Sequence, residues 1–214
     1  MKVQPFDNGI FGATTYLVYD EKLNEAALID CTCSTDEIQQ TIIKNKLNLK
    51  YILITHAHFD HVYCLSKMKS MFQNTQILMS KEDLYLLDNI HTQCTMACVE
   101  DITVPCTDGF IDENSKNLKI GESEIKIIQT PGHSKGGVCY LIDDNVLFSG
   151  DTLFKDSIGR CDLFGGSIEE IGKSIKEKLF KLNDDIIVYP GHGDKTTIGH
   201  EKKYNPYFGE VYSR

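Results

Sequence analysis

The sequence lacks the features that mark membrane proteins, secreted proteins and disordered chains. No apolar run approaches 18 residues, and the first residues, Met1 to Asp7, contain no apolar core of signal-peptide length. No low-complexity tract, internal repeat or linker interrupts the chain. These absences predict a cytoplasmic protein with no membrane partner.

An excess of positive charge is also missing. The chain has 22 Lys and Arg against 31 Asp and Glu, a net charge of −9. Phosphate backbones are bound largely through clustered Lys and Arg, so no nucleic-acid partner is expected. The length of 214 residues, with 41% hydrophobic and 25% charged residues, is typical of one well-packed globular domain. We therefore expect a single domain over residues 1–214, and its oligomeric state stays open.

The eight cysteines are expected to be reduced, because no secretory signal accompanies them. Cys31-x-Cys33 and Cys94-x-x-x-Cys98 are interpreted as small apolar fillers. A thiol metal site or a redox pair is the alternative, but neither motif has a second matching pair.

The most informative segment is the run from His56 to His61. It holds four potential metal ligands in six residues, directly after the apolar stretch Tyr51–Thr55, which predicts a buried strand. Neutral imidazoles and a carboxylate suit a borderline ion such as Zn²⁺, and core packing gives no reason to crowd them together. This pattern predicts a metal site at the end of a strand. Its four candidate ligands are His56, His58, Asp60 and His61.

Three further candidates follow the same pattern of strand, glycine turn and ligand. His133 follows a predicted strand at 124–129, Asp151 follows one at 146–149, and His192 follows one at 186–189. Glycine lets the backbone turn sharply, and functional groups gather where strand ends meet loops. Seven ligands at four strand ends indicate two metal ions. Taken singly, a histidine or a Gly-Asp step is more often a plain turn residue, so these three depend on the context they share with the first cluster.

His91 and His200 lie in polar stretches without such a strand. Both are interpreted as solvated residues. The segment 91–107 is polar and weakly periodic, and it is predicted to be a loop over the cleft or a plain surface connection.

The apolar pattern elsewhere predicts a mixed α/β fold. The stretches 14–19 and 26–29 are predicted to form a hairpin, and 36–47 a helix with an apolar face. The sequence after the metal loop carries another apolar stripe, and Ser167 to Glu170 is a capping box that begins a third helix. The residues expected to face the core in these helices are Ile38, Ile42, Ile43, Leu47, Leu65, Met68, Phe72, Ile168, Ile171, Ile175, Leu179 and Leu182.

The chain resembles the metallo-β-lactamase superfamily, and within it the short, single-domain proteins similar to glyoxalase II, the hydroxyacylglutathione hydrolases. The matching landmarks cover nearly the whole chain in the family's order. They are His56-x-His58-x-Asp60-His61, Thr130-Pro131-Gly132-His133-Ser134, Gly150-Asp151-Thr152-Leu153-Phe154, Tyr189-Pro190-Gly191-His192 and the tail Glu201-x-x-Tyr204-Asn205-Pro206.

The resemblance implies a four-layer αββα sandwich with a dinuclear site. In that site His56, His58 and His133 hold one ion, Asp60, His61 and His192 hold the other, and Asp151 bridges them. Zn²⁺ is the expected ion, and Fe²⁺ and Mn²⁺ accept the same ligands. At the Gly159-Arg160 step, relatives similar to glyoxalase II have a basic residue that meets the substrate's carboxylate, so Arg160 is the matching candidate.

Sequence differences from other branches of the superfamily narrow the range of expected functions. Common class B β-lactamases have Cys at the position of Asp151, and flavodiiron oxygen reductases have Glu at the position of His58. Only 22 residues follow His192, too few for the helical domain with which full glyoxalase II enzymes bind glutathione. The expected function is hydrolysis of small-molecule thioesters by a metal-bridging hydroxide, with Asp60 orienting it and relaying its proton.

Two alternatives stay open. Persulfide dioxygenases resemble the chain and hold one iron through residues matching His56, His133 and Asp151, with open positions for O₂. A non-catalytic metal-binding protein is the second alternative. It is less favoured, because seven mixed N and O ligands shared by two ions leave room for water.

Overall fold

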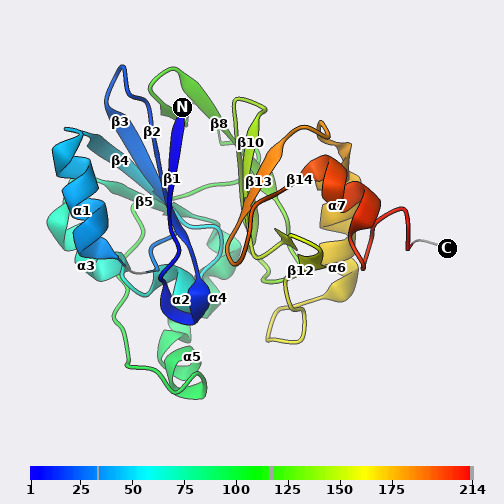
Figure 1. Cartoon of the computed structure of the whole chain (residues 1–214). Coiled ribbons are helices and arrows are strands. Elements are labelled where there is room, and N and C mark those ends of the chain that lie inside the picture. The colour runs from blue at the N-terminus through cyan, green and yellow to red at the C-terminus, as the bar shows by residue number, and fades with distance from the viewer. Residues whose placement is uncertain (33, 116–117, 213–214) are drawn as a thin grey trace. The chain divides into compact units, whose positions relative to one another are not determined.

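The computed structural model describes residues 1–32, 34–115 and 118–212. The chain forms two compact units (Figure 1). The first unit comprises Met1–Ile111 and Lys119–Ser123, and the second comprises Asp112–Leu118 and Glu124–Arg214. Each unit combines a sheet with helices, so the predicted mixed α/β class is confirmed.

The first unit contains a sheet in the strand order β1-β2-β3-β4-β5-β6. Strands β1, β2 and β3 pair antiparallel, whereas β3, β4, β5 and β6 run parallel. The elements of this unit are β1 (Lys2–Phe6), the 3-10 helix η1 (Ile10–Gly12), β2 (Thr15–Tyr19), β3 (Glu25–Ile29), α1 (Thr35–Lys44), β4 (Asn48–Leu53), α2 (Phe59–Val62), α3 (Leu65–Met71), β5 (Gln76–Met79), η2 (Lys81–Asp83), α4 (Leu84–Asp88), α5 (Ile90–Met96), β6 (Gly109–Phe110) and β7 (Lys119–Ile120).

Strands β2 and β3 are buried almost throughout. Successive side chains of a strand point to opposite faces, so both faces of the sheet are covered here. Helices α1 and α3 lie side by side along the sheet (Figure 1), and Ile38 and Met68 from these helices join the same apolar core as Leu28 and Ile52. The predicted hairpin of β2 and β3 is confirmed.

The helix predicted over 36–47 is shorter than expected and exposes one of its predicted core residues. α1 ends at Lys44, and Lys46 has a φ of 53°, which breaks the helical path. Ile38 and Ile42 are buried, but Ile43 is 64% exposed. Neighbouring residues in a helix lie about 100° apart around its axis, and Ile43 lies on the side of α1 away from the buried Ile38 and Ile42.

The second unit contains strands in the order β14-β13-β10-β9-β8. β10 and β13 are parallel, and the other neighbours are antiparallel. Its elements are β8 (Ser123–Gln129, which begins in the first unit), β9 (Val138–Ile142), β10 (Val146–Gly150), the small pair β11 (Leu153–Phe154) and β12 (Ser157–Ile158), α6 (Ile168–Lys173), the π-helix η3 (Ser174–Lys178), the 3-10 helix η4 (Leu179–Lys181), β13 (Ile187–Pro190), β14 (Thr196–Thr197) and α7 (Ile198–Tyr204).

The predicted helix start at Ser167 is confirmed, because its hydroxyl accepts a hydrogen bond from the Glu170 amide. Ile171 and Ile175 are buried in the core of this unit. The prediction for Ile168 is wrong. It is 56% exposed, and it is the first residue of α6.

The predictions for 91–107 are also partly wrong, since its first residues belong to α5. The part of the chain that the structure describes contains no helix with both the length and the apolar character that a membrane span requires.

Candidate metal-binding residues

In the first unit, the candidate ligands follow the parallel strand β4. Beyond Leu53 the chain keeps its pairing through the Ile54 amide, which bonds to the Leu78 carbonyl at 2.9 Å. The Thr55 amide then donates to Asp30 Oδ1 at 2.7 Å. Strands β3, β4 and β5 run parallel, so their carboxyl ends share one edge, and the loop after β3 meets the loop after β4 there.

Three imidazoles of this loop pack against one another. The ring centroids of His56 and His58 are 4.9 Å apart, and those of His56 and His61 are 4.1 Å apart. Asp60 is close by, with 3.9 Å between its Oδ2 and His61 Nε2. Neutral imidazole is the metal-binding form of histidine, so the cluster offers three candidate ligand nitrogens beside one carboxylate.

Asp30 orients two of these histidines through hydrogen bonds. Its Oδ2 accepts from His61 Nδ1 at 2.8 Å and from the Thr55 hydroxyl at 2.8 Å. Thr55 Oγ1 lies 3.1 Å from His56 Nδ1, and because the Thr55 hydroxyl hydrogen is donated to Asp30, this oxygen accepts a hydrogen bond from His56 Nδ1. Both rings therefore carry hydrogen on Nδ1, which leaves Nε2 as the nitrogen with a lone pair for a metal.

The loop backbone is also fixed from the helical side. The Ala57 amide donates to the buried carboxylate of Asp83 at 3.1 Å, and the Phe59 amide donates to Gln93 Oε1 at 3.1 Å. Asp83 precedes α4, and Gln93 lies in α5. The helical segment that the sequence did not predict thus helps to hold the candidate ligands in place.

In the second unit, His133, Asp151 and His192 follow β8, β10 and β13. Parallel pairing of β10 with β13 brings the last two to the same sheet edge, where the Gly191 amide donates to the Gly150 carbonyl at 2.8 Å. The Nε2 atoms of His133 and of His192 each lie 3.5 Å from Oδ2 of Asp151. Two imidazole nitrogens therefore converge on one carboxylate oxygen, and N and O donors of this kind suit divalent ions.

His133 is oriented by the backbone of the Gly159-Arg160 step. Its Nδ1 donates to the Arg160 carbonyl at 2.7 Å, which leaves Nε2 for the side of Asp151. Gly159 itself approaches Asp151 so closely that a Cβ would lie 1.7 Å from the Asp151 carbonyl oxygen. Only glycine fits this position, so the loop supports two candidate ligands through main-chain contacts.

Arg160 points its side chain at a neighbouring acid. Its Nε and Nη2 donate to the two carboxylate oxygens of Asp162 at 2.8 and 2.7 Å. This bidentate pair raises the pKa of Arg160 and lowers the pKa of Asp162 to about 2. Both side chains are largely exposed. The role of Arg160 in binding a substrate carboxylate stays a prediction.

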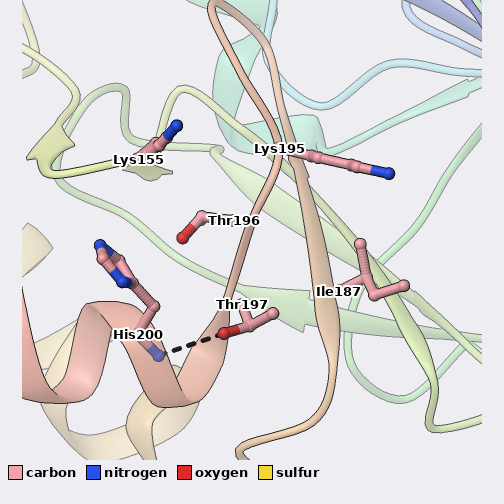
Figure 2. Close-up of a pocket in the computed structure, with 6 residues that line it drawn as sticks. All are labelled: Lys155, Ile187, Lys195, Thr196, Thr197 and His200. Atoms are coloured by element: carbon pink, nitrogen blue, oxygen red, sulfur yellow. Dashed lines mark hydrogen bonds between the residues drawn. The ribbon is translucent and has the colours of Figure 1, made fainter.

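His200 belongs to a different part of the second unit. A cavity of about 460 Å³ is lined there by Lys155, Ile187, Lys195, Thr196, Thr197 and His200, which Figure 2 draws as sticks. The His200 side chain is 39% exposed and bonds to Asp156 at 2.7 Å, so its interpretation as a solvated residue is not contradicted. The exposed position of His91 agrees with the prediction.

Glu201 forms a third carboxylate and histidine group with Asp156 and His200. Glu201 is fully buried and accepts hydrogen bonds from the Thr196 hydroxyl at 2.6 Å and from the Asn205 amide at 2.8 Å. These bonds connect β14, the start of α7 and its end. We interpret the group as a structural brace.

No cysteine among the described residues belongs to the candidate metal-binding groups. None of the described cysteines forms a disulfide, and Cys33 lies outside the described residues. Burial raises the pKa of Cys139 to about 11, so this thiol stays protonated at neutral pH. Cys94 is buried as a small apolar filler should be, but Cys98 is exposed, so that interpretation is wrong for Cys98.

The sequence reasoning missed Asp30, Thr55, Asp83 and Gln93 as supporting residues. Asp30 had a usable signal, because it directly follows the strand ending at Ile29, just as the candidate ligands follow theirs. Asp83 and Gln93 lie in helical segments, where sequence gives no indication of a bond to a distant loop.

Comparison with known proteins gives consistent matches over most of the chain. The family model described as "Metallo-beta-lactamase superfamily" matches residues 8–192. The chain is 36% identical over 193 residues to the hydroxyacylglutathione hydrolase GloC of Haemophilus influenzae, covering 89% of this chain and 90% of GloC.

Two solved structures extend this similarity to the fold. BLEG-1, described as a B3 metallo-beta-lactamase, has a TM-score of 0.88 at 30% identity and covers 100% of both chains. TTHA1623, solved in a di-iron-bound form, has a TM-score of 0.86 at 28% identity, covering 96% of this chain and 100% of that one.

Proposed function

We propose that this chain, which belongs to the metallo-β-lactamase superfamily, is a metal-dependent hydrolase of thioesters. The observation that carries the proposal is the similarity to GloC, named a hydroxyacylglutathione hydrolase, over about nine tenths of both chains. The family match runs through residues of both compact units, which supports one metallohydrolase domain over 1–214. The cytoplasmic location stays a prediction, which cell fractionation would test.

The histidine and aspartate groups support binding of divalent metal ions. In each unit, hydrogen bonds to Nδ1 leave Nε2 as the ligand nitrogen, at His61 through Asp30 and at His133 through Arg160. Such donors accept Zn²⁺, Fe²⁺ and Mn²⁺, and the di-iron-bound form of TTHA1623 supports iron among these ions. The proposed ligand sets are His56, His58 and His133 for one ion, Asp60, His61 and His192 for the other, and Asp151 as the bridge.

Bound divalent ions would supply an activated water and would polarise the thioester carbonyl. The chain's own contribution is to orient ligands and to handle the proton. Asp60 lies in the first turn of the short helix α2, and its Oδ2 lies 3.9 Å from His61 Nε2, so it is the proposed acceptor of the water's proton. A thiolate leaves without much acid help, which agrees with the lack of an assigned general acid.

The test compares three substrate classes on protein analysed for metal. Anaerobic hydrolysis of a hydroxyacylglutathione thioester, lost after chelation and restored by Zn²⁺, Fe²⁺ or Mn²⁺, is the expected result. His91→Ala, an exposed histidine, is the matched control for variants of the ligand histidines. Failure of every metal-loaded form to cleave a thioester would refute the proposal.

Two other outcomes are covered by the same experiment. Cleavage of a β-lactam without cleavage of thioesters would favour the activity in the description of BLEG-1. Oxygen uptake with a persulfide, and one iron per chain, would favour the dioxygenase alternative that uses His56, His133 and Asp151.

A further inference from the structure

Phe11 is an unusually placed aromatic residue. It lies in the short helix η1 with φ 55° and ψ 20°, in the left-handed region that side-chain-bearing residues rarely adopt. Its side chain is 63% exposed. Both the backbone conformation and the exposure are unfavourable for a phenylalanine, and such outliers persist where the surrounding structure enforces them.

The surrounding loop enforces this conformation. The Gly9 amide donates to the Ala13 carbonyl at 3.1 Å, and the Ala13 amide donates back to the Ile10 carbonyl at 3.1 Å. A Cβ on Gly9 would lie 2.1 Å from the Ala13 carbonyl oxygen, so the loop is closed as tightly as glycine allows. Ala13 is fully buried. The base of the loop, at Gly9 and Ala13, is therefore fixed, and the side chain of Phe11 lies exposed at the surface.

The ring of Phe11 contacts Phe59 of the metal-ligand loop. Their centroids are 5.6 Å apart with an interplanar angle of 89°, an edge-to-face contact. Figure 1 shows the segment after β1 beside α2, which Phe59 begins. Phe59 stands between the candidate ligands His58 and Asp60 in sequence, and it packs against the core of the first unit. The Phe59 ring is thus held against the core, and the exposed Phe11 ring extends the apolar surface toward solvent.

We propose that Phe11 and Phe59 form an apolar wall that binds the acyl group of the substrate. The inference rests on the proposed function, because that function makes the loop around Phe59 the reaction site. The candidate ligands on either side of Phe59, His58 and Asp60, are polar. Phe59 and Phe11 therefore supply apolar contact surface at this loop. An aromatic or branched acyl group would cover Phe11, whereas an acetyl group is too small to do so.

The first experiment compares two thioesters of one thiol carrier. Phe11→Ala is expected to lower kcat/KM for the phenylacetyl thioester about tenfold relative to the acetyl thioester, with metal content unchanged. Ile43→Ala, which removes a similarly exposed apolar side chain from α1, is the matched control and should leave the ratio unchanged. If Phe11 only fastens the loop, both substrates will lose activity equally, and the proposal is overturned.

The second experiment needs no turnover. The chain has no tryptophan, so Phe11→Trp introduces a single reporter at the wall. Phenylacetate should change its fluorescence with saturation, acetate at the same concentration should not, and Ile43→Trp should respond to neither. If wild-type protein cleaves thioesters, the kinetic ratio decides the proposal. If it cleaves none, the proposed function fails, and the fluorescence titration alone tests the binding wall. In that case the lack of a response to phenylacetate overturns the proposal that Phe11 and Phe59 bind an acyl group.

Discussion

Asp30 accepts a hydrogen bond of 2.8 Å from His61 Nδ1, and both side chains are almost completely buried. The same carboxylate reaches His56 through the Thr55 hydroxyl. One acidic residue outside the candidate ligand set therefore fixes the orientation of two imidazoles within it. Partners of this kind govern how well a histidine binds metal.

Asp30→Asn should weaken metal binding roughly 10- to 100-fold. The carboxylate accepts hydrogen bonds from His61 and Thr55, whereas the NH₂ group of an asparagine side chain can only donate. The substitution should also lower the free energy of unfolding by about 1–3 kcal/mol, the cost of a poorly satisfied buried polar group. Metal titration and thermal unfolding measure both effects. Asp36→Asn, an exposed carboxylate on α1, is the control and should change neither. Unchanged metal affinity in Asp30→Asn would remove Asp30 from the supporting role.

Metal stoichiometry tests the division of the ligands into two sets. The wild-type protein is expected to hold close to two ions, because the proposed ligands form two triads and a bridge. His58→Ala should empty mainly the first site and His61→Ala mainly the second, and Asp151→Ala should empty both, since it bridges. Elemental analysis after gel filtration gives the ion count, with His91→Ala as control. A fully active protein with one ion would contradict the dinuclear arrangement.

Much of this arrangement could be predicted from the sequence because its signals are local. Strands followed by glycine turns and ligands are visible at His133 and His192, and the capping box at Ser167 is a motif four residues long. Whether a helical side chain faces the core or the solvent is harder to predict, as Ile43 and Ile168 illustrate. Adjacent apolar residues suit more than one helical stripe, and only the position of the core decides between them.

Long-range contacts explain what the sequence could not predict. The link between Asp30 and His61 joins loops 31 positions apart, and it depends on the parallel pairing of β3 with β4. The left-handed backbone conformation of Phe11 could not be predicted from the sequence either, because it follows from the hydrogen bonds that close the loop around Gly9. Sequence patterns name candidate ligands, whereas the residues that orient them appear only when the strands are paired.

Gly159→Ala should disturb the second unit strongly. The new methyl group would lie 1.7 Å from the Asp151 carbonyl oxygen and 3.1 Å from His133 Nδ1. A contact with backbone cannot be relieved by a rotamer change, so a loss of about 1–3 kcal/mol in unfolding free energy is expected, together with weaker metal binding. Gly109→Ala, whose methyl would meet only the flexible end of Leu78, is the control for the change from glycine to alanine. Equal stability of the two variants would show that the loop moves freely.

The pair Arg160 and Asp162 predicts both a pH effect and a substrate effect. Arg160 lowers the pKa of Asp162 from 3.8 to about 2, so the pair stabilises the fold above pH 3.8 and loses that contribution as the pH falls toward 2. Both side chains are exposed, so the effect on stability is small. In Arg160→Ala, NMR titration should return the pKa of Asp162 toward 3.8.

Because an exposed ion pair is weak, Arg160 can exchange Asp162 for a substrate carboxylate. Arg160→Ala should therefore raise KM for a carboxylated thioester roughly three- to tenfold and leave an uncarboxylated one unchanged. Asp162→Asn should have the opposite effect on the carboxylated thioester, since it removes the competing acid while Arg160 remains. The main-chain bond from His133 to the Arg160 carbonyl does not depend on either side chain, so metal content should stay constant in both variants. If Arg160→Ala affects both substrates equally, the arginine braces the loop and does not bind substrate.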